Sequence, residues 1–369
     1  MIVKNVCCWD LEGPISVLDF AAELSKLLSN KTKLSLHKFN MGEFYKMLSK
    51  YDDYLIEVPG VKEELNIPNY QPGDTLRLVA PLYMASFSNN ELNKLAKRNL
   101  GLLPGCIDLM KTLHKNWDIY IISTSYTHFA HNVAKTLKIP EDHVFCTEFD
   151  IKNTNETFHN IKSEVDILVK GIFKKFEDSN QNLDAIIKDL NNFFWKKEES
   201  DYFKVMDKIK VRGGKRKEQA VETISNQTQV PISEIIALGD SITDIDMLQR
   251  LKDEDGIAVS FNGNHFTVSR ANIAITTPSN LGTLPIFEHK VNIDAFLESW
   301  ESLYSSFNNN PRKIPDDLIS KEIKNYFIKY QFIPEIVSLK NKTKGELDFI
   351  TTKQEMMRKK VRGWAGHLG

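Results

Sequence analysis

Two short apolar segments, far apart in the chain, each run directly into acidic residues. The first is Val6 to Trp9, followed by Asp10 and Glu12, and the second is Ile235 to Leu238, followed by Asp240 and Asp244. Short apolar runs that end in polar residues are typical of buried strands in a parallel sheet. The carboxyl ends of such strands meet at one edge, where ligands bind. Because carboxylate oxygens are the ligands of hard cations, the pattern predicts a divalent-cation site there.

Predicted strands and helices alternate along much of the chain. The segments concerned are residues 117–123, 130–137, 144–149, 217–225, 235–238, 244–251, 256–260 and 273–275. Such alternation is typical of a parallel sheet with helices on both faces. We therefore predict an α/β fold with a doubly wound parallel sheet, helical insertions and a helical C-terminal extension.

Breaks in this alternation suggest how the chain is divided. Two stretches have apolar residues at helical spacing, with turn-rich or lysine-rich segments, and are predicted to be helical inserts. The predicted units are a core of residues 1–15, 100–150 and 211–284, a first insert of 16–99, a second insert of 151–210, and a C-terminal extension of 285–369.

The charge balance gives no reason to expect nucleic acid or an anionic membrane as a partner. Lys and Arg number 48 against 49 Asp and Glu, a net charge of -1. The cysteines, Cys7, Cys8, Cys106 and Cys146, lack metal-ligand spacing, which favours reduced thiols. No apolar run reaches the ~18 residues of a membrane span, and the N-terminus lacks a signal-peptide layout. We expect a cytoplasmic protein without membrane insertion.

Four motifs, in this order, carry a family resemblance. They are Asp10 to Pro14, Ile121 to Tyr126, Val211 to Val221 and Gly239 to Asp244. Together they resemble the haloacid dehalogenase-like (HAD) phosphohydrolases, and the Asp-Leu-Glu-Gly of the first motif is similar to that of the phosphoserine-phosphatase-like subgroup. The resemblance spans roughly residues 2–277. It implies a Rossmannoid core whose inserts form helical caps over the active site.

The resemblance implies the chemistry of the first and last motifs. Asp10, ionised at neutral pH, would be the nucleophile that forms an aspartyl-phosphate, and Glu12 the general acid and base. The family usually has Asp at the second position. Mg²⁺ would be held by Asp10, the backbone carbonyl of Glu12 and Asp240. Asp244 would bind the metal directly or through water, or would anchor a lysine.

The two middle motifs would bind the phosphoryl group. At the end of a strand, Ser123 and Thr124 can donate hydrogen bonds to phosphoryl oxygens, and Ser125 remains an alternative to Ser123. A lysine in the third motif would neutralise the phosphoryl group. Lys217, at the start of a predicted helix, fits this role, and Lys215 is the alternative.

The predicted function is Mg²⁺-dependent hydrolysis of a small phosphorylated metabolite. A phosphotransferase to an alcohol acceptor is a second possibility. Residues 10–16 and 258–264 also resemble an archaeal HAD group labelled energy-converting hydrogenase A subunit R, which implies an accessory role in a protein complex. The basic segment that contains Arg358 and Arg362 is either a docking element for such a partner or a solvated helix end.

Overall fold

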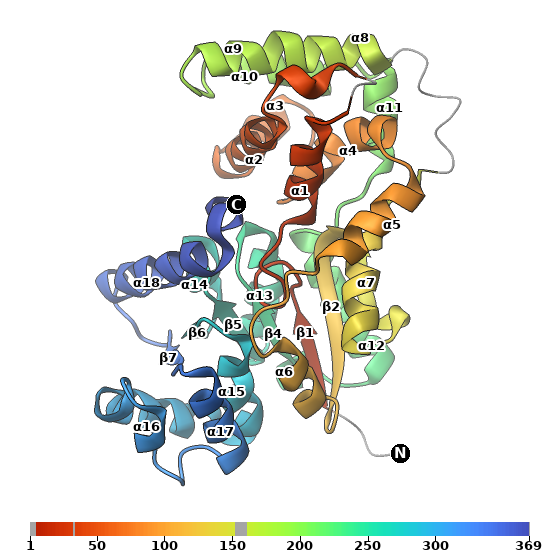
Figure 1. Cartoon of the computed structure of the whole chain (residues 1–369). Coiled ribbons are helices and arrows are strands. Elements are labelled where there is room, and N and C mark those ends of the chain that lie inside the picture. Colours follow the sequence, from red (N-terminus) through yellow and green to blue (C-terminus); the bar gives the residue numbers. More distant parts are fainter. Residues whose placement is uncertain (1–4, 32–33, 152–160, 369) are drawn as a thin grey trace.

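The computed structural model describes residues 5–31, 34–151 and 161–368 (Figure 1). The first strand is seen from Asn5, and residues 1–4 of the predicted core lie outside the described part. Residues 152–160 of the predicted second insert and residue 369 of the extension also lie outside it.

A single sheet of seven strands forms the centre of the molecule. Its spatial order is β3-β2-β1-β4-β5-β6-β7. The first six strands pair in parallel, and β7 pairs with β6 in the antiparallel sense. The strands are β1 (Asn5–Trp9), β2 (Trp117–Tyr126), β3 (Val144–Thr147), β4 (Ile236–Gly239), β5 (Ile257–Phe261), β6 (Ile273–Thr276) and β7 (Glu335–Ser338).

The sheet is buried on both faces because its strands carry apolar residues at successive positions. In β1, Cys7 and Trp9 belong to one apolar cluster, whereas Val6 and Cys8 belong to the other. Successive side chains of a strand point to opposite faces, so each face needs a layer of helices. The helices that flank the sheet are α6 (Cys106–Leu113), α7 (Thr127–Leu137), α12 (Lys215–Thr228), α13 (Ile245–Asp253), α14 (His265–Arg270) and α15 (Leu284–Glu288).

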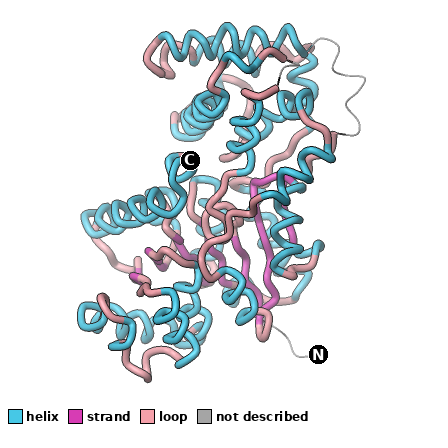
Figure 2. Tube along the Cα trace, viewed as in Figure 1, coloured by secondary structure: helices cyan, strands magenta, loops and turns pink. Residues whose placement is uncertain are grey.

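A lobe of helices lies beyond the carboxyl edge of the sheet (Figures 1 and 2). It contains helices from two separate stretches of the chain. Those of the first stretch are α1 (Phe20–Leu28), α2 (Met41–Glu57), α3 (Val61–Glu64), α4 (Thr75–Ser86) and α5 (Asn89–Arg98). Those of the second are α8 (Ile161–Val165), α9 (Lys174–Asp178), α10 (Ile187–Trp195) and α11 (Asp201–Lys208), with a π-helical stretch, Asp166–Phe173, between α8 and α9.

Buried polar contacts join the two stretches of this lobe. The Tyr202 hydroxyl donates to the carbonyl of Leu78 at 2.6 Å, and the Trp195 indole donates to the Tyr51 hydroxyl at 2.8 Å. Satisfied hydrogen bonds of this kind fix how apolar surfaces pack. The two inserts therefore pack as one lobe, while the domain limits named above stay predictions.

After two helices, the C-terminal segment adds a strand to the edge of the sheet and then packs back against the core. It contains α16 (Ile293–Phe307), α17 (Lys321–Tyr330), β7, α18 (Lys344–Arg362) and a final 3₁₀ turn, Gly363–His367. The α/β fold class with its helical extension is confirmed. The extension also contributes β7, which the sequence did not reveal because four residues are too few for a clear alternation. Among the described residues, no helix has both the length and the apolar character needed to cross a bilayer.

Candidate active site

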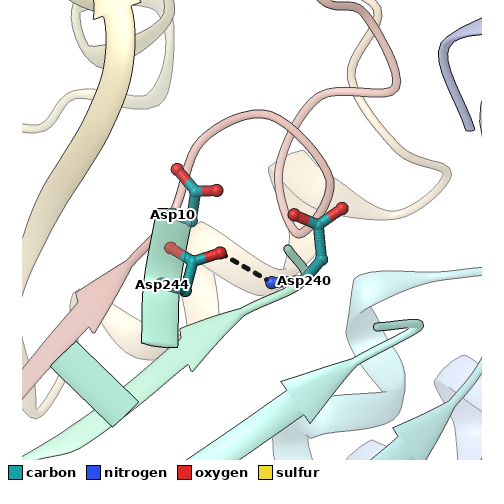
Figure 3. A group of neighbouring side chains, drawn as sticks. All are labelled: Asp10, Asp240 and Asp244. Carbon is teal, nitrogen blue, oxygen red and sulfur yellow. Dashed lines mark hydrogen bonds between the residues drawn. The ribbon is translucent and has the colours of Figure 1, made fainter. Parts of the chain in front are cut away.

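Three carboxylates from the first and last motifs meet at the carboxyl edge of the sheet. β1 and β4 are neighbours in register, with Trp9 opposite Leu238, and the amide of Asp10 donates to the carbonyl of Leu238 at 2.9 Å. The two strands therefore end at the same level. One oxygen each of Asp10, Asp240 and Asp244 lies within 4.8 Å of the others (Figure 3). The predicted convergence of these acids is thus present in the fold.

A glycine allows the two loops to come this close. Gly13 has φ +129°, a conformation that residues with a side chain rarely adopt. A Cβ atom placed on it would lie 2.1 Å from Oδ2 of Asp240. Any other residue at this position would be strained and would displace the Asp240 carboxylate.

Lys217 lies between two of the carboxylates. Its ammonium is 2.8 Å from Oδ1 of Asp10 and 2.6 Å from Oδ1 of Asp244, and its side chain has no exposed surface. Burial alone would lower the pKa of this lysine, but the charges of Asp10 and Asp244 raise it above its usual value. It therefore stays a cation. Lys215, the alternative considered above, is exposed.

Asp244 anchors the fourth motif. Its Oδ2 accepts hydrogen bonds from the amides of Asp240 at 3.0 Å and Ser241 at 3.1 Å, while its Oδ1 receives Lys217. Figure 3 shows the bond to the Asp240 amide. Both oxygens of Asp244 are thus engaged by nitrogen donors, and this geometry fits an anchoring role for the residue.

The two carboxylate oxygens of Asp240 differ in their hydrogen bonds: one accepts none within the described part of the chain, and the other accepts from two arginines. Its buried Oδ1 receives no hydrogen bond from any described residue. Its Oδ2 receives Arg358 and, at 2.8 Å, Arg362. A buried carboxylate oxygen without a donor is costly unless a cation faces it. Together with the neighbouring oxygens of Asp10, this oxygen fits a hard cation such as Mg²⁺.

The environment of Asp10 opposes its charge. Burial and the charge of Asp244 together raise the pKa of its carboxyl to about 7, although Lys217 opposes this shift. Its Oδ1 also accepts a hydrogen bond from the Leu11 amide at 2.7 Å. A positive partner that favours the ionised form is therefore needed for Asp10 to act as a nucleophile at neutral pH.

The Glu12 side chain lies outside the group of three carboxylates. Its Oε1 accepts a hydrogen bond from the Phe20 amide at 3.0 Å, at the start of α1. Burial and, to a smaller extent, the charge of Asp19 raise the pKa of Glu12 to about 8. A carboxyl group that holds its proton at neutral pH suits a general acid. The predicted role of Glu12 as a metal ligand, through its backbone carbonyl, stays a prediction.

The three hydroxyl residues of the second motif have different surroundings. Ser123 is fully buried, and its Oγ accepts a hydrogen bond from the Ser125 amide at 3.0 Å. The buried Ser125 hydroxyl interacts with the Glu12 carboxyl and lowers the pKa of that group, against the larger effect of burial. Thr124 lines the cavity above the carboxylates. All three lie at the end of β2, so the choice among them as phosphoryl ligands stays a prediction.

A small cavity of about 70 Å³ lies directly over the acids. Asp10 and Glu12 line it from the core, Asp19 and Asp52 from the helical lobe, and Arg358 from α18. This volume corresponds to a few water molecules, so the site is nearly closed. A larger cavity of about 1010 Å³ lies beside α5 and α7, and its lining contains no member of the carboxylate group.

Sequence reasoning missed the contribution of the C-terminal helix. The basic segment at residues 358–362 was expected to be a docking element or a solvated helix end. Lys359 and Lys360 are exposed, but the Arg358 and Arg362 side chains are only 4% and 6% exposed. The one available signal was that the two arginines stand four residues apart, which places them on the same helix face.

Comparisons with known proteins bear on the family and on the fold. Residues 107–282 match the family of haloacid dehalogenase-like hydrolases. The solved structure of a gene product from Archaeoglobus fulgidus is 23% identical and covers 99% of each chain with a TM-score of 0.71, so it shares the fold.

Two structures of phosphoserine phosphatase are more distant. One holds substrate and the other an analogue of the phospho-aspartyl intermediate, and each is 12% identical to this chain. Each covers 76% of this chain and 97% of its own, with TM-scores of 0.46 and 0.45. No curated protein matches the chain. The similarity to the haloacid dehalogenase-like hydrolases thus lies in residues 107–282, the part of the chain that contains β2 to β6.

Proposed function

We propose that the protein is a Mg²⁺-dependent phosphomonoester hydrolase that acts through an aspartyl-phosphate on Asp10. The observation that carries this proposal is the joint burial of Asp10, Asp240 and Asp244 around the ammonium of Lys217. A purely structural role would not require like charges to be held together in a buried site. A nucleophile beside a cation and a further acid, by contrast, is what phosphoryl transfer requires.

The residues divide the reaction between them. Asp10 attacks the phosphorus atom while Glu12 gives its proton to the leaving oxygen, and Lys217 stabilises the negative charge that the phosphoryl oxygens carry. Glu12, now ionised, then takes a proton from a water molecule that cleaves the aspartyl-phosphate. When bound, Mg²⁺ would neutralise charge on both Asp10 and the phosphoryl group. Asp240 and Asp10, with the Glu12 carbonyl, would hold it.

Metal removal gives the first test. We expect hydrolysis of an aryl phosphate to fall to background after treatment with a chelator and to return when Mg²⁺ is added, because a bound Mg²⁺ would offset the charges of Asp10 and of the phosphoryl group as they approach each other. The rate is followed by absorbance of the released phenol. Activity that persists in the chelated protein would contradict the proposal.

The pH profile tests the role of Glu12. Since the pKa of Glu12 is raised to about 8 and the acid must be protonated, kcat/KM is expected to fall as the pH rises through about 8. Replacing Asp19 by Asn removes a negative charge beside Glu12, so the pKa of Glu12 falls and this loss of activity moves to lower pH, by about 1 unit.

The asparagine keeps the helix cap that Asp19 provides, in which Oδ1 accepts from the Ala22 amide at 2.8 Å. Glu63→Gln, at an exposed position of the same lobe, is the matched control and should leave the profile in place. An alkaline limb that does not move in Asp19→Asn would show that Glu12 is not the titrating acid.

The substrate that we propose is a small phosphorylated metabolite. The cavity of about 70 Å³ leaves room for little more than the reacting group, so the helical lobe must move to admit the rest of a substrate. A panel of phosphorylated metabolites, each compared by kcat/KM for release of inorganic phosphate, would identify the class. Equal rates for all members would argue against a dedicated metabolite phosphatase.

A further inference from the structure

Two arginines of α18 enter the carboxylate site from the C-terminal extension. Arg358 donates from Nη1 to the backbone carbonyl of Asp240 at 2.8 Å and also to the carboxylate of that residue. Arg362, one helical turn further on, donates to the same carboxylate oxygen at 2.8 Å. Two guanidinium groups therefore converge on one carboxylate inside the protein.

Contacts on two sides hold the part of the chain that carries the arginines. On the core side, the buried Gln354 accepts from the Gly263 amide at 2.7 Å and donates to the Ser260 carbonyl at 3.0 Å. On the side of the helical lobe, the ring of Trp364 lies 4.1 Å from the ammonium of Lys26. The C-terminus lies between the core and this lobe in Figure 1. The position of the arginines is thus set by packing on either side of the site.

The arginines change the charge of the site. Asp10, Asp240 and Asp244 carry three negative charges when ionised, and Lys217 carries one positive charge. With Arg358 and Arg362 added, the site is neutral; without them it would have a net charge of -2. A site of charge -2 would favour a divalent cation and repel a phosphate dianion. A neutral site can accept both together.

The guanidinium groups also retain donors for a ligand. Arginine has five N–H donors. The hydrogen bonds described here use three of those of Arg358, including one to the Leu368 carbonyl at 2.9 Å, and two of those of Arg362. Both residues line the small cavity over Asp10 and Glu12. Their planar groups match the geometry of phosphate oxygens.

We propose that Arg358 and Arg362 form an anion-binding subsite for the phosphoryl group, so that the C-terminal extension supplies part of the active site. The inference rests on the proposed phosphatase function. It predicts different effects on two ligands: loss of the arginines weakens the binding of phosphate but strengthens, or leaves unchanged, the binding of Mg²⁺. A merely structural role would weaken both.

Calorimetric titration can separate these outcomes. The full-length protein is titrated with MgCl₂ alone, and then with inorganic phosphate in the presence of saturating Mg²⁺. For Arg358→Gln and Arg362→Gln we expect the Kd of phosphate to rise at least about 10-fold, and that of Mg²⁺ to stay constant or fall several-fold. Arg358→Lys keeps the positive charge but loses the planar group, so its Kd for phosphate should lie between those of the wild type and Arg358→Gln. Lys360→Gln, exposed on the same helix, is the control and should bind both ligands as the wild type does.

Each result bears on the proposal. Unchanged phosphate affinity in the glutamine variants, or an equal loss of both ligands, would overturn it. If a glutamine variant does not fold, as judged by circular dichroism, Arg358→Lys tests the proposal in its place. A phosphate affinity of Arg358→Lys equal to that of the wild type would contradict the proposed subsite. A wild type that binds Mg²⁺ but no phosphate would instead refute the proposed function, and this inference with it.

Discussion

Asp10→Asn is expected to lower kcat for phosphomonoester hydrolysis by at least about 1,000-fold, or about 4 kcal/mol of transition-state stabilisation. An amide cannot form the aspartyl-phosphate, whereas its oxygen can still accept the hydrogen bonds that Asp10 receives from Leu11 and Lys217. The fold should therefore survive. Relief of the repulsion between Asp10 and Asp244 favours equal or higher stability, because the charge of Asp244 raises the pKa of Asp10. Initial rates and the thermal midpoint of the same preparation check both parts.

The matched control for this variant is Asp246→Asn, in the same motif region as Asp244 but outside the carboxylate group. Its activity should stay within a few-fold of the wild type. Mass spectrometry of acid-quenched enzyme adds a direct observation, since a phosphoryl group should appear on the peptide that contains Asp10 and be absent in Asp10→Asn. Turnover by Asp10→Asn at the wild-type rate would rule out Asp10 as the nucleophile.

The part of the site that lies on strand ends could be predicted because its signals are local. Asp10 and Asp240 each follow an apolar strand within one or two residues, and parallel strands that are neighbours must end at a common edge. The preference for Lys217 over Lys215 rested on a helix start predicted at Lys217, but α12 begins at Lys215, and it is packing that buries Lys217. The local signals are the strand ends and the edge that they share. These features depend on secondary structure and topology, which short sequence patterns determine well.

The contribution of α18 could not be predicted, because it depends on a contact between distant segments. Arg358 and Asp240 are 118 residues apart in the sequence. In the sequence, Arg358 and Arg362 differ little from the exposed lysines between them, and only packing decides which face of the helix is buried. The same limit applies to Asp19 and Asp52, which reach the cavity from the helical lobe. Residues that a lobe or extension supplies to an active site leave no local signal.

How the elements outside the core pack could also not be predicted from the sequence. The inserts were predicted to be helical from their apolar spacing, but the sequence did not indicate that they pack together through residues such as Tyr202 and Trp195. β7 is four residues long and pairs only at the edge of the sheet. Its formation depends on the exposed edge of β6 more than on its own sequence.

Lys217→Met is expected to destabilise the fold and to impair catalysis together. Methionine has a similar volume, so the change mainly removes a buried charge that lies 2.8 Å from Asp10 and 2.6 Å from Asp244. Breaking a buried ion pair in this way costs about 3–5 kcal/mol of unfolding free energy. Loss of phosphoryl stabilisation should reduce kcat/KM by about 100-fold or more. Urea unfolding and aryl phosphate hydrolysis measure the two effects.

The pH dependence of this destabilisation identifies its cause. Lys217 lowers the pKa of Asp10, so the variant should raise it further above its value in the unfolded chain. Between the pKa of Asp10 in the unfolded chain and its higher pKa in the folded variant, the folded state binds more protons than the unfolded state. The stability of the variant therefore falls as the pH rises through this range. We therefore expect a larger loss at pH 8 than at pH 5, and a smaller loss when Mg²⁺ supplies positive charge to the carboxylates. Lys215→Met, at an exposed position, should change stability by less than about 0.5 kcal/mol at either pH. A loss in Lys217→Met that is the same at both pH values and in Mg²⁺ would indicate a packing defect, and Lys217 would then not be the cation that balances Asp10 and Asp244.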